Sequence, residues 1–251
     1  MLKQRIITAL VLLPLFLAGL LATSATGFAW FISLIIGVAA WEWARMGGLE
    51  AQSQRVAYAA LVLVALLLIR LLPVPAVLTV AFAGWILAAL LVFRWPAWQA
   101  AWSRAGVRLA VGLLLLHAAW VALVHLRVTT WALDDRISGL HLILYVFLIV
   151  WCADIGAYFV GRAWGRRKLA PSVSPGKSVE GAGGGLLAVS LLPLLAGQWL
   201  DLSASQVGLL WLVSVVTALF SIVGDLLESL AKRSVGIKDS SQILPGHGGI
   251  M

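Results

Sequence analysis

Long apolar runs separated by short polar connections make up most of this chain. A helix needs about 20 consecutive apolar residues to cross the hydrocarbon core of a bilayer, with a range of roughly 17 to 25. Eight runs approach that length, at 6–23, 27–45, 56–72, 76–93, 107–126, 140–160, 182–200 and 207–230. The pattern predicts an all-α polytopic membrane protein with about eight transmembrane helices, which form a single integral membrane domain over residues 1–251.

The first run also fits a second interpretation, a cleaved signal peptide. Lys3 and Arg5 precede it, and small residues follow it at 22–25. The length of the run and the second span that follows at once favour a retained transmembrane helix.

The overall composition agrees with a membrane protein. Hydrophobic residues make up 62% of the chain and charged residues 11%, whereas soluble domains carry roughly 25% charged residues. The mean hydropathy is +1.02. A single cysteine, Cys152, excludes a disulfide framework and a cysteine zinc site.

The net charge of +8 is spread over short loops between apolar runs, which favours an anionic membrane surface and an anionic substrate over nucleic acid. Lys and Arg accumulate in the short cytoplasmic loops of membrane proteins. With the N-terminus inside, 15 of the 18 Lys and Arg residues fall in inner segments, and Arg70, Arg127 and Arg136 fall in outer ones. We therefore expect a cytoplasmic N-terminus.

With that orientation, four acidic residues fall toward the cytoplasmic ends of predicted spans. An ionised side chain at mid-bilayer costs about 2.5 to 3.5 kcal/mol or more, so such residues are usually paired or functional. These four predict a shared polar cavity; they are Glu42, Asp154, Asp225 and Glu228. For Glu42 taken alone, the favoured interpretation is a carboxylate at a helix end that pairs with Arg45.

The last stretch of the chain, 224–251, changes from apolar to charged and ends in a glycine-rich turn. Asp225 and Glu228 are three residues apart and share one face of a helix, where they could hold a metal. Glycines on both sides of His247 allow the backbone to approach a ligand, and exposed amides there could bind phosphate. The alternative is a helix end whose charges are only solvated at the headgroups.

The connection at 154–181 is the most basic loop of the chain. We expect Gly161 and Gly165 to end the preceding helix, and the neighbouring Arg and Lys residues suit phosphate. The segment 174–178 predicts a turn that presents Lys177 between two hydroxyls. It is not a phosphate-binding loop of the GxxxxGK[ST] type, because the first glycine is absent. The alternative is a basic loop that serves orientation alone.

These two stretches resemble the phosphatidate cytidylyltransferases. The C-terminal stretch is similar to the family pattern SxxKRxxxxKDxxxxxPGHGG, and the loop to DxGAYxxGRxxG(K/R)xKLxPxxSPxKSxEG. The matching positions in the first pattern are Ser229, Lys232, Arg233, Lys238, Asp239, Pro245, Gly246, His247, Gly248 and Gly249. The resemblance in detail covers about residues 154–249, so 1–140 would form N-terminal transmembrane helices and 141–251 the catalytic helices and cytoplasmic loops.

The resemblance implies transfer of CMP from CTP to phosphatidate, with Mg²⁺, at the cytoplasmic face of a bacterial-type inner membrane. In such a site we expect Asp225, Lys232, Arg233, Lys238, Asp239 and His247 in catalysis, Arg162, Lys168, Ser174, Lys177, Ser178, Ser229, Gly248 and Gly249 at the substrate, and Asp225, Glu228 and Asp154 at the metal. The sequence leaves open whether the protein forms a homodimer.

The family pattern continues into Asp-Arg-x-Asp, which would begin just after Met251. In the family, the metal draws on the aspartate that matches Asp225 and on the aspartate of that segment. The resemblance therefore leads us to expect weak or no activity from the 251-residue chain and activity from a longer version.

Two other functions remain open on the residues alone. A CTP-dependent lipid kinase, of the polyprenol or phytol type, would use a similar basic site on an alcohol acceptor. A transporter would place Glu42, Asp154 and Asp225 along a path, although transporter sites usually lie near the midplane of the bilayer.

Overall fold

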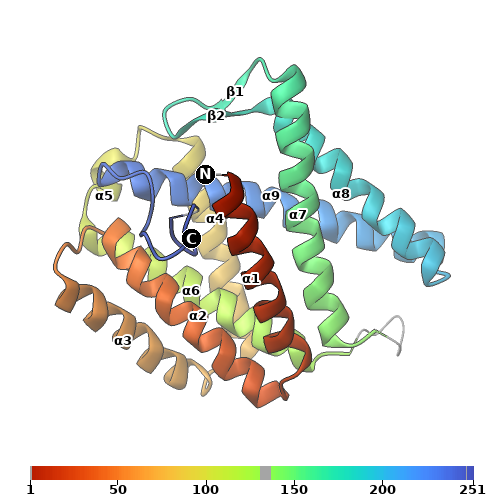
Figure 1. Ribbon diagram of the computed structural model, residues 1–251, viewed down its shortest axis with the longest axis horizontal. Helices are drawn as coiled ribbons and strands as arrows, with labels where there is room; N and C mark the ends of the chain where they lie inside the picture. Colours follow the sequence, from red (N-terminus) through yellow and green to blue (C-terminus); the bar gives the residue numbers. More distant parts are fainter. Residues whose placement is uncertain (1, 131–136, 247) are drawn as a thin grey trace. The chain divides into compact units, whose positions relative to one another are not determined.

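The computed structural model describes residues 2–130, 137–246 and 248–251, and almost all of its regular structure is helical (Figure 1). The elements in chain order are α1 (Leu2–Leu21), α2 (Ala25–Met46), α3 (Gln52–Ile69), α4 (Val74–Phe93), α5 (Gln99–Trp102), α6 (Ala105–Val128), α7 (Gly139–Trp164), β1 (Lys168–Ala170), β2 (Ser174–Ser178), α8 (Val179–Trp199) and α9 (Ala204–Ser234). Each of the eight predicted apolar runs forms a helix.

Among the described residues, seven helices are long and apolar enough to cross a membrane. They are α2, α3, α4, α6, α7, α8 and α9, and a shorter apolar stretch, Leu10–Leu21, lies within α1. The prediction of an all-α polytopic membrane protein is therefore confirmed.

The chain divides into two compact units, which we describe separately. Residues 1–129 and 231–251 form the first unit, and residues 130–230 form the second. Helix α9 belongs to the second unit up to residue 230, and its last turn belongs to the first.

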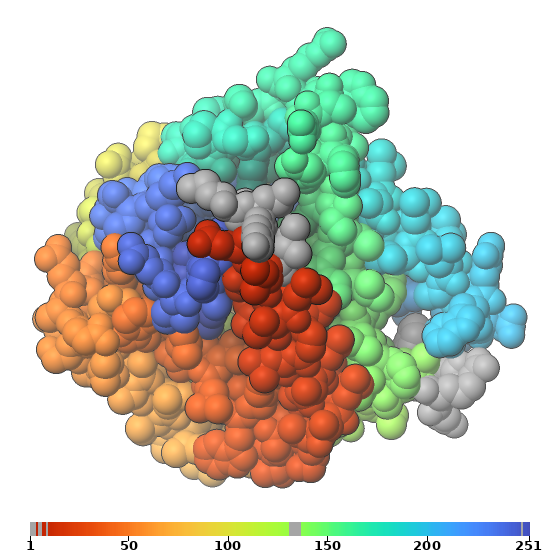
Figure 2. Space-filling view, viewed as in Figure 1, coloured from red at the N-terminus to blue at the C-terminus, as the bar shows by residue number. Residues whose placement is uncertain are grey.

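In the first unit, α2 packs against both α3 and α6, and α4 packs against α6. Phe28 and Val62 are fully buried in this packing. The Trp43 indole donates to the backbone carbonyl of Arg108 at 2.8 Å, and the Tyr58 hydroxyl donates to that of Leu109 at 2.7 Å. Aromatic side chains thus join the helices through both apolar contact and carbonyl groups. The C-terminal segment, in dark blue, lies beside α1 and α2 in Figure 2.

In the second unit, α7 and α8 approach each other closely because small residues face each other. A β-carbon on Gly156 would lie 2.6 Å from the carbonyl oxygen of Gly184, and one on Gly185 would lie 2.6 Å from that of Ala153. Such approach through small residues is the usual basis of helix packing in membranes, where water does not drive apolar surfaces together. Buried residues of α7, α8 and α9 complete this core, among them Ile149, Val189 and Ala218.

A two-stranded antiparallel hairpin connects α7 to α8 (Figure 1). Of the two glycines expected to end α7, Gly165 is confirmed and Gly161 is not: the helix continues to Trp164, and the Gly165 N–H donates to the Gly161 carbonyl at 3.0 Å. The prediction of a turn at 174–178 was wrong. Residues 174–178 are a strand and not a turn, since they pair with β1; the turn lies at 171–173.

Candidate active site

A cavity of about 410 Å³ lies within the second unit, between α7, the hairpin, α8 and α9. The residues that line it are Ala153, Asp154, Ala157, Tyr158, Gly161, Arg162, Leu169, Gly176, Lys177, Ser178, Gly181, Ala182, Gly185, Ser221, Ile222 and Asp225. Most of the wall is apolar or small, and a few polar groups converge on it. This combination is typical of a small-molecule site.

Two carboxylates line the cavity from different helices: Asp154 from α7 and Asp225 from α9. Asp225 forms an ion pair with Lys177, the lysine of strand β2. The Asp225 side chain is 51% exposed, so ions and ligands can reach its carboxylate. The sequence pattern placed these two acids at the ends of spans, and the fold brings them to one cavity.

Basic groups face the same space. Lys177 and Arg162 line the cavity, and the Arg162 guanidinium donates to the Tyr158 hydroxyl at 3.0 Å, which holds it along the exposed face of α7. A guanidinium and an ammonium beside two carboxylates form a site that can receive both a phosphate group and a cation.

The N-terminus of α8 opens onto the cavity. The Ser178 hydroxyl caps it by accepting the N–H of Gly181 at 3.1 Å, and Ser178, Gly181 and Ala182 all line the wall. The N-terminal end of a helix carries a partial positive charge and favours anions. Gly181 leaves little room for a side chain, because a β-carbon there would make an unusually tight contact of 3.0 Å with the Ala157 carbonyl oxygen.

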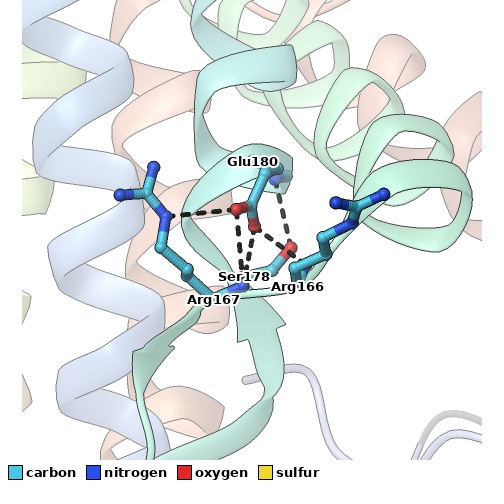
Figure 3. A network of polar contacts seen from close by, with 5 residues as sticks. Arg166, Arg167, Ser178 and Glu180 are labelled. Carbon is cyan, nitrogen blue, oxygen red and sulfur yellow. Dashed lines mark hydrogen bonds and ion pairs between the residues drawn. The ribbon is translucent and has the colours of Figure 1, made fainter.

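Glu180 holds the base of the hairpin in place (Figure 3). Its carboxylate accepts the backbone N–H groups of Arg166 at 3.0 Å and Arg167 at 3.1 Å, and it pairs with the Arg167 guanidinium at 3.3 Å. These contacts join the start of α8 to the chain that leaves α7. The strand that carries Lys177 is therefore anchored at both ends, and the lysine is directed into the cavity.

Several predicted site residues of this unit do not line the cavity. Lys168 and Ser174 lie in the hairpin, where they pair with Ser178 and Ala170 respectively. Glu228 and Ser229 follow Asp225 on α9 but are not among the lining residues. Asp154, Arg162, Lys177, Ser178 and Asp225 are the predicted residues that the fold brings together.

The donor set fits Mg²⁺ better than a metal held by protein alone. Across the described ranges, no group of three or more His, Cys, Asp and Glu side chains could enclose a metal ion. Magnesium, however, usually takes one or two carboxylates and completes its shell with water and substrate oxygens. Asp154 and Asp225 at one cavity meet that requirement.

The remaining predicted residues belong to the first unit. Lys232 and Arg233 lie in the last turn of α9, and Lys238 and Asp239 lie in the exposed loop that follows. Gly248 has a φ of +91°, a conformation that favours glycine. His247 lies outside the described residues.

Sequence reasoning missed the role of one acid, Glu42. The predicted pair with Arg45 is absent among the described ion pairs; Arg45 donates instead to the Ser240 carbonyl at 3.3 Å. The Glu42 carboxylate is fully buried and accepts the hydroxyls of Ser240 at 2.8 Å and Ser241 at 2.6 Å. Its position in an apolar run was a signal that it has partners, but the helix period does not indicate that those partners lie almost 200 residues away.

Known proteins resemble this chain over its whole length. The sequence model of the Cytidylyltransferase family matches residues 3–251. The chain is 48% identical to a phosphatidate cytidylyltransferase of Pseudomonas aeruginosa over 253 residues, which cover all of this chain and 91% of that protein. It is 36% identical to one of Haemophilus influenzae, over all of this chain and 93% of that protein. One of Staphylococcus epidermidis is 49% identical over 118 residues, 47% of this chain and 45% of that protein. The chain therefore belongs to the cytidylyltransferase family.

Proposed function

We propose that this chain transfers CMP from CTP to phosphatidate and produces CDP-diacylglycerol and pyrophosphate for phospholipid biosynthesis. The names of its relatives support this reaction, and family membership makes the chain a nucleotidyltransferase. The observation that carries the proposal is the cavity between α7, α8 and α9, where Asp154 and Asp225 face Lys177 and Arg162. Neither the kinase nor the transporter alternative receives support from the comparisons.

The reaction joins two anions, and the residues of the cavity address their repulsion. A phosphate oxygen of phosphatidate attacks the α-phosphorus of CTP, and the bond from that phosphorus to the bridging oxygen of the β-phosphate breaks. Lys177 and Arg162 would bind phosphate oxygens and stabilise the charge that develops on the leaving pyrophosphate. The attacking phosphate is already ionised, so no side chain needs to act as a general base.

Asp225 and Asp154 would hold Mg²⁺. A magnesium ion held there would supply positive charge that offsets the negative charge of the phosphate groups. Lys177 pairs with Asp225. This pairing keeps the ammonium group beside the carboxylate, where an incoming nucleotide phosphate would need it.

We place the site at the cytoplasmic face of a bacterial inner membrane, where CTP is available. The distribution of Lys and Arg supports this orientation, because the hairpin and the connections next to it carry the largest share of basic residues. Lys232 and Arg233, in the last turn of α9, and Lys238, in the loop after it, belong to the first unit, and the family resemblance alone assigns them to the triphosphate. The bacterial sources of the relatives agree with such a membrane.

The experiment is incorporation of label from CTP into lipid in detergent micelles with Mg²⁺. CTP labelled in the cytosine ring and CTP labelled at the γ-phosphate are compared, with phosphatidate and with a polyprenol as acceptors. Ring label on phosphatidate supports the proposal, whereas γ-label alone on the alcohol would indicate the kinase. Uptake of ions into vesicles without nucleotide turnover would indicate a transporter. A version extended through Asp-Arg-x-Asp is assayed beside the 251-residue chain, which tests the expectation drawn from that signature.

A further inference from the structure

The C-terminal segment 240–251 is bound to a single buried carboxylate, that of Glu42 in α2. One oxygen, Oε1, accepts the Ser241 hydroxyl at 2.6 Å and the Ile250 N–H at 3.0 Å. The other, Oε2, accepts the Ser240 hydroxyl at 2.8 Å and the Met251 N–H at 3.0 Å. Four donors surround the group, and each belongs to the same twelve-residue segment. This is the arrangement that an acceptor-only carboxylate requires when it is removed from water.

One glycine of this segment, Gly249, lies against the same carboxylate. A β-carbon on Gly249 would collide with the Ser240 hydroxyl and with both Glu42 oxygens. The Gly249 backbone therefore lies directly against the acid, and the residue is buried. Although we predicted Gly249 as a substrate residue, this contact accounts for the glycine without a ligand.

The turn between the two anchored ends is closed on itself. Leu244 and Gly248 exchange two backbone hydrogen bonds of 2.8 Å, and the Thr8 hydroxyl of α1 donates to the Pro245 carbonyl at 2.9 Å. Serines before this turn and amides after it both bind Glu42. The carboxylate thus holds both ends of segment 240–251 at one point.

We propose that Glu42 is a positioning residue for nucleotide transfer: it fixes segment 240–251 and thereby the side chains of Lys238 and Asp239 just before it. The inference rests on the proposed function, because the segment has a role in binding CTP only if the chain is a cytidylyltransferase that uses CTP. Glu42 itself contacts no substrate in this account. A positioning role for Glu42 would give α2, one of the N-terminal helices, a function beyond that of an apolar span.

The test uses Glu42→Gln, which preserves size but replaces one acceptor oxygen with an NH₂ donor. A serine hydroxyl can rotate to meet that donor, but a backbone N–H cannot, so either Ile250 or Met251 loses its partner. We expect hydrogen exchange at those two amides to accelerate about tenfold or more as the segment opens locally. We expect the KM for CTP to rise about tenfold, because small misplacements of binding groups have large effects on rate and binding. Lower stability alone would reduce the active fraction and leave the KM unchanged.

Glu50→Gln is the matched control. Glu50 is exposed in the connection after α2, and its substitution removes the same charge from the same unit. It should leave both the KM and the amide exchange within about twofold of the parent protein. Gly249→Ala should reproduce the effects of Glu42→Gln, and the double variant should be little worse than either single one, because both disrupt one contact.

Each result decides a separate point. If the parent protein turns over and Glu42→Gln opens the segment with an unchanged KM, the positioning role is overturned and the proposed function stands. If the Ile250 and Met251 amides of Glu42→Gln exchange as slowly as in the parent protein, Glu42 does not hold the segment in place. If neither the parent protein nor the extended version makes CDP-diacylglycerol, the proposed function is wrong, and so is the role of Glu42 in nucleotide transfer. Hydrogen exchange would then test only whether Glu42 holds the C-terminal segment.

Discussion

The hydroxyl of Ser241 donates to the carboxylate of Glu42 at 2.6 Å across 199 residues of sequence. This bond and its neighbours place the C-terminal segment on α2, a helix that carries none of the residues of the proposed cavity. The first unit is therefore assembled from both ends of the chain. A change in α2 can affect the C-terminal segment directly, without passing through the intervening residues.

Asp225→Asn should reduce turnover of CTP and phosphatidate by about a hundredfold or more. The amide has the same shape but one neutral oxygen, so it both loses the pair with Lys177 and binds Mg²⁺ poorly. The measurement is initial rate over a range of Mg²⁺ concentrations. Asp201→Asn is the control, because Asp201 is exposed at the end of α8 with a φ of 53°, which asparagine tolerates. Comparable losses in both variants would remove Asp225 from the metal site.

Lys177→Met should raise the KM for CTP about tenfold, which corresponds to about 1.4 kcal/mol of lost binding. The methionine retains the stem of the side chain but not the ammonium that faces Asp225 and the cavity. Lys168→Met should have a smaller effect, since Lys168 lies in the hairpin away from the cavity wall. Steady-state kinetics of the two variants provide the ranking. A larger rise in KM for Lys168→Met than for Lys177→Met would indicate that the phosphate binds at strand β1 and not in the cavity.

Glu180→Ala should loosen the base of the hairpin. The backbone N–H groups of Arg166 and Arg167 lose their acceptor, and the strand that presents Lys177 loses one of its two anchors. We expect trypsin to cleave after Arg166 or Arg167 several times faster than in the parent protein, with slower turnover of CTP. Glu50→Ala, a substitution of an exposed acid in the other unit, should change neither rate. Unchanged cleavage in Glu180→Ala would show that strand pairing alone holds the hairpin.

Gly156→Ala should destabilise the protein by about 1 to 3 kcal/mol, the usual cost of overpacking. A β-carbon at this position lies 2.6 Å from the Gly184 carbonyl oxygen and 2.8 Å from the β-carbon of Ala188, so α7 and α8 must separate. Gly183→Ala is the matched control, because nothing lies within 4 Å of its β-carbon position. It should be neutral or stabilise by up to about 1 kcal/mol, as alanine favours the helix. Thermal unfolding in detergent measures both, and equal midpoints would contradict the close packing.

The proposed orientation predicts which connections a membrane-impermeant maleimide can reach. In a Cys152→Ala background, Ser172→Cys in the hairpin turn should react only after the inner membrane is opened. Leu71→Cys, at a position 81% exposed between α3 and α4, should react from the outside of intact spheroplasts. Reaction of both sites in the reverse pattern would invert the topology and place the cavity on the outer face.

The pattern of apolar runs was sufficient to predict the class of fold. A helix that crosses a bilayer must satisfy its backbone hydrogen bonds within itself, so a long apolar run allows few other structures. The C-terminal end of α7 and the form of the hairpin were less accessible from sequence. Gly165 and not Gly161 caps the helix, and pairing with β1 makes residues 174–178 a strand despite Pro175. The basic composition of that loop indicates phosphate chemistry but not which lysine enters the cavity.

The chemical character of the site was also present in the sequence alone: acids near span ends, basic residues between them and a family signature. Tertiary structure decided which of them meet. Asp154, Lys177 and Asp225 come from α7, β2 and α9, and the fold brings them to the wall of one cavity. Glu42 and Ser241 meet because a buried carboxylate must find donors wherever the fold supplies them, and helix periodicity records only neighbours three or four residues away. The sequence of this chain therefore indicates the chemical character of the site, whereas contacts between residues far apart in sequence depend on tertiary packing.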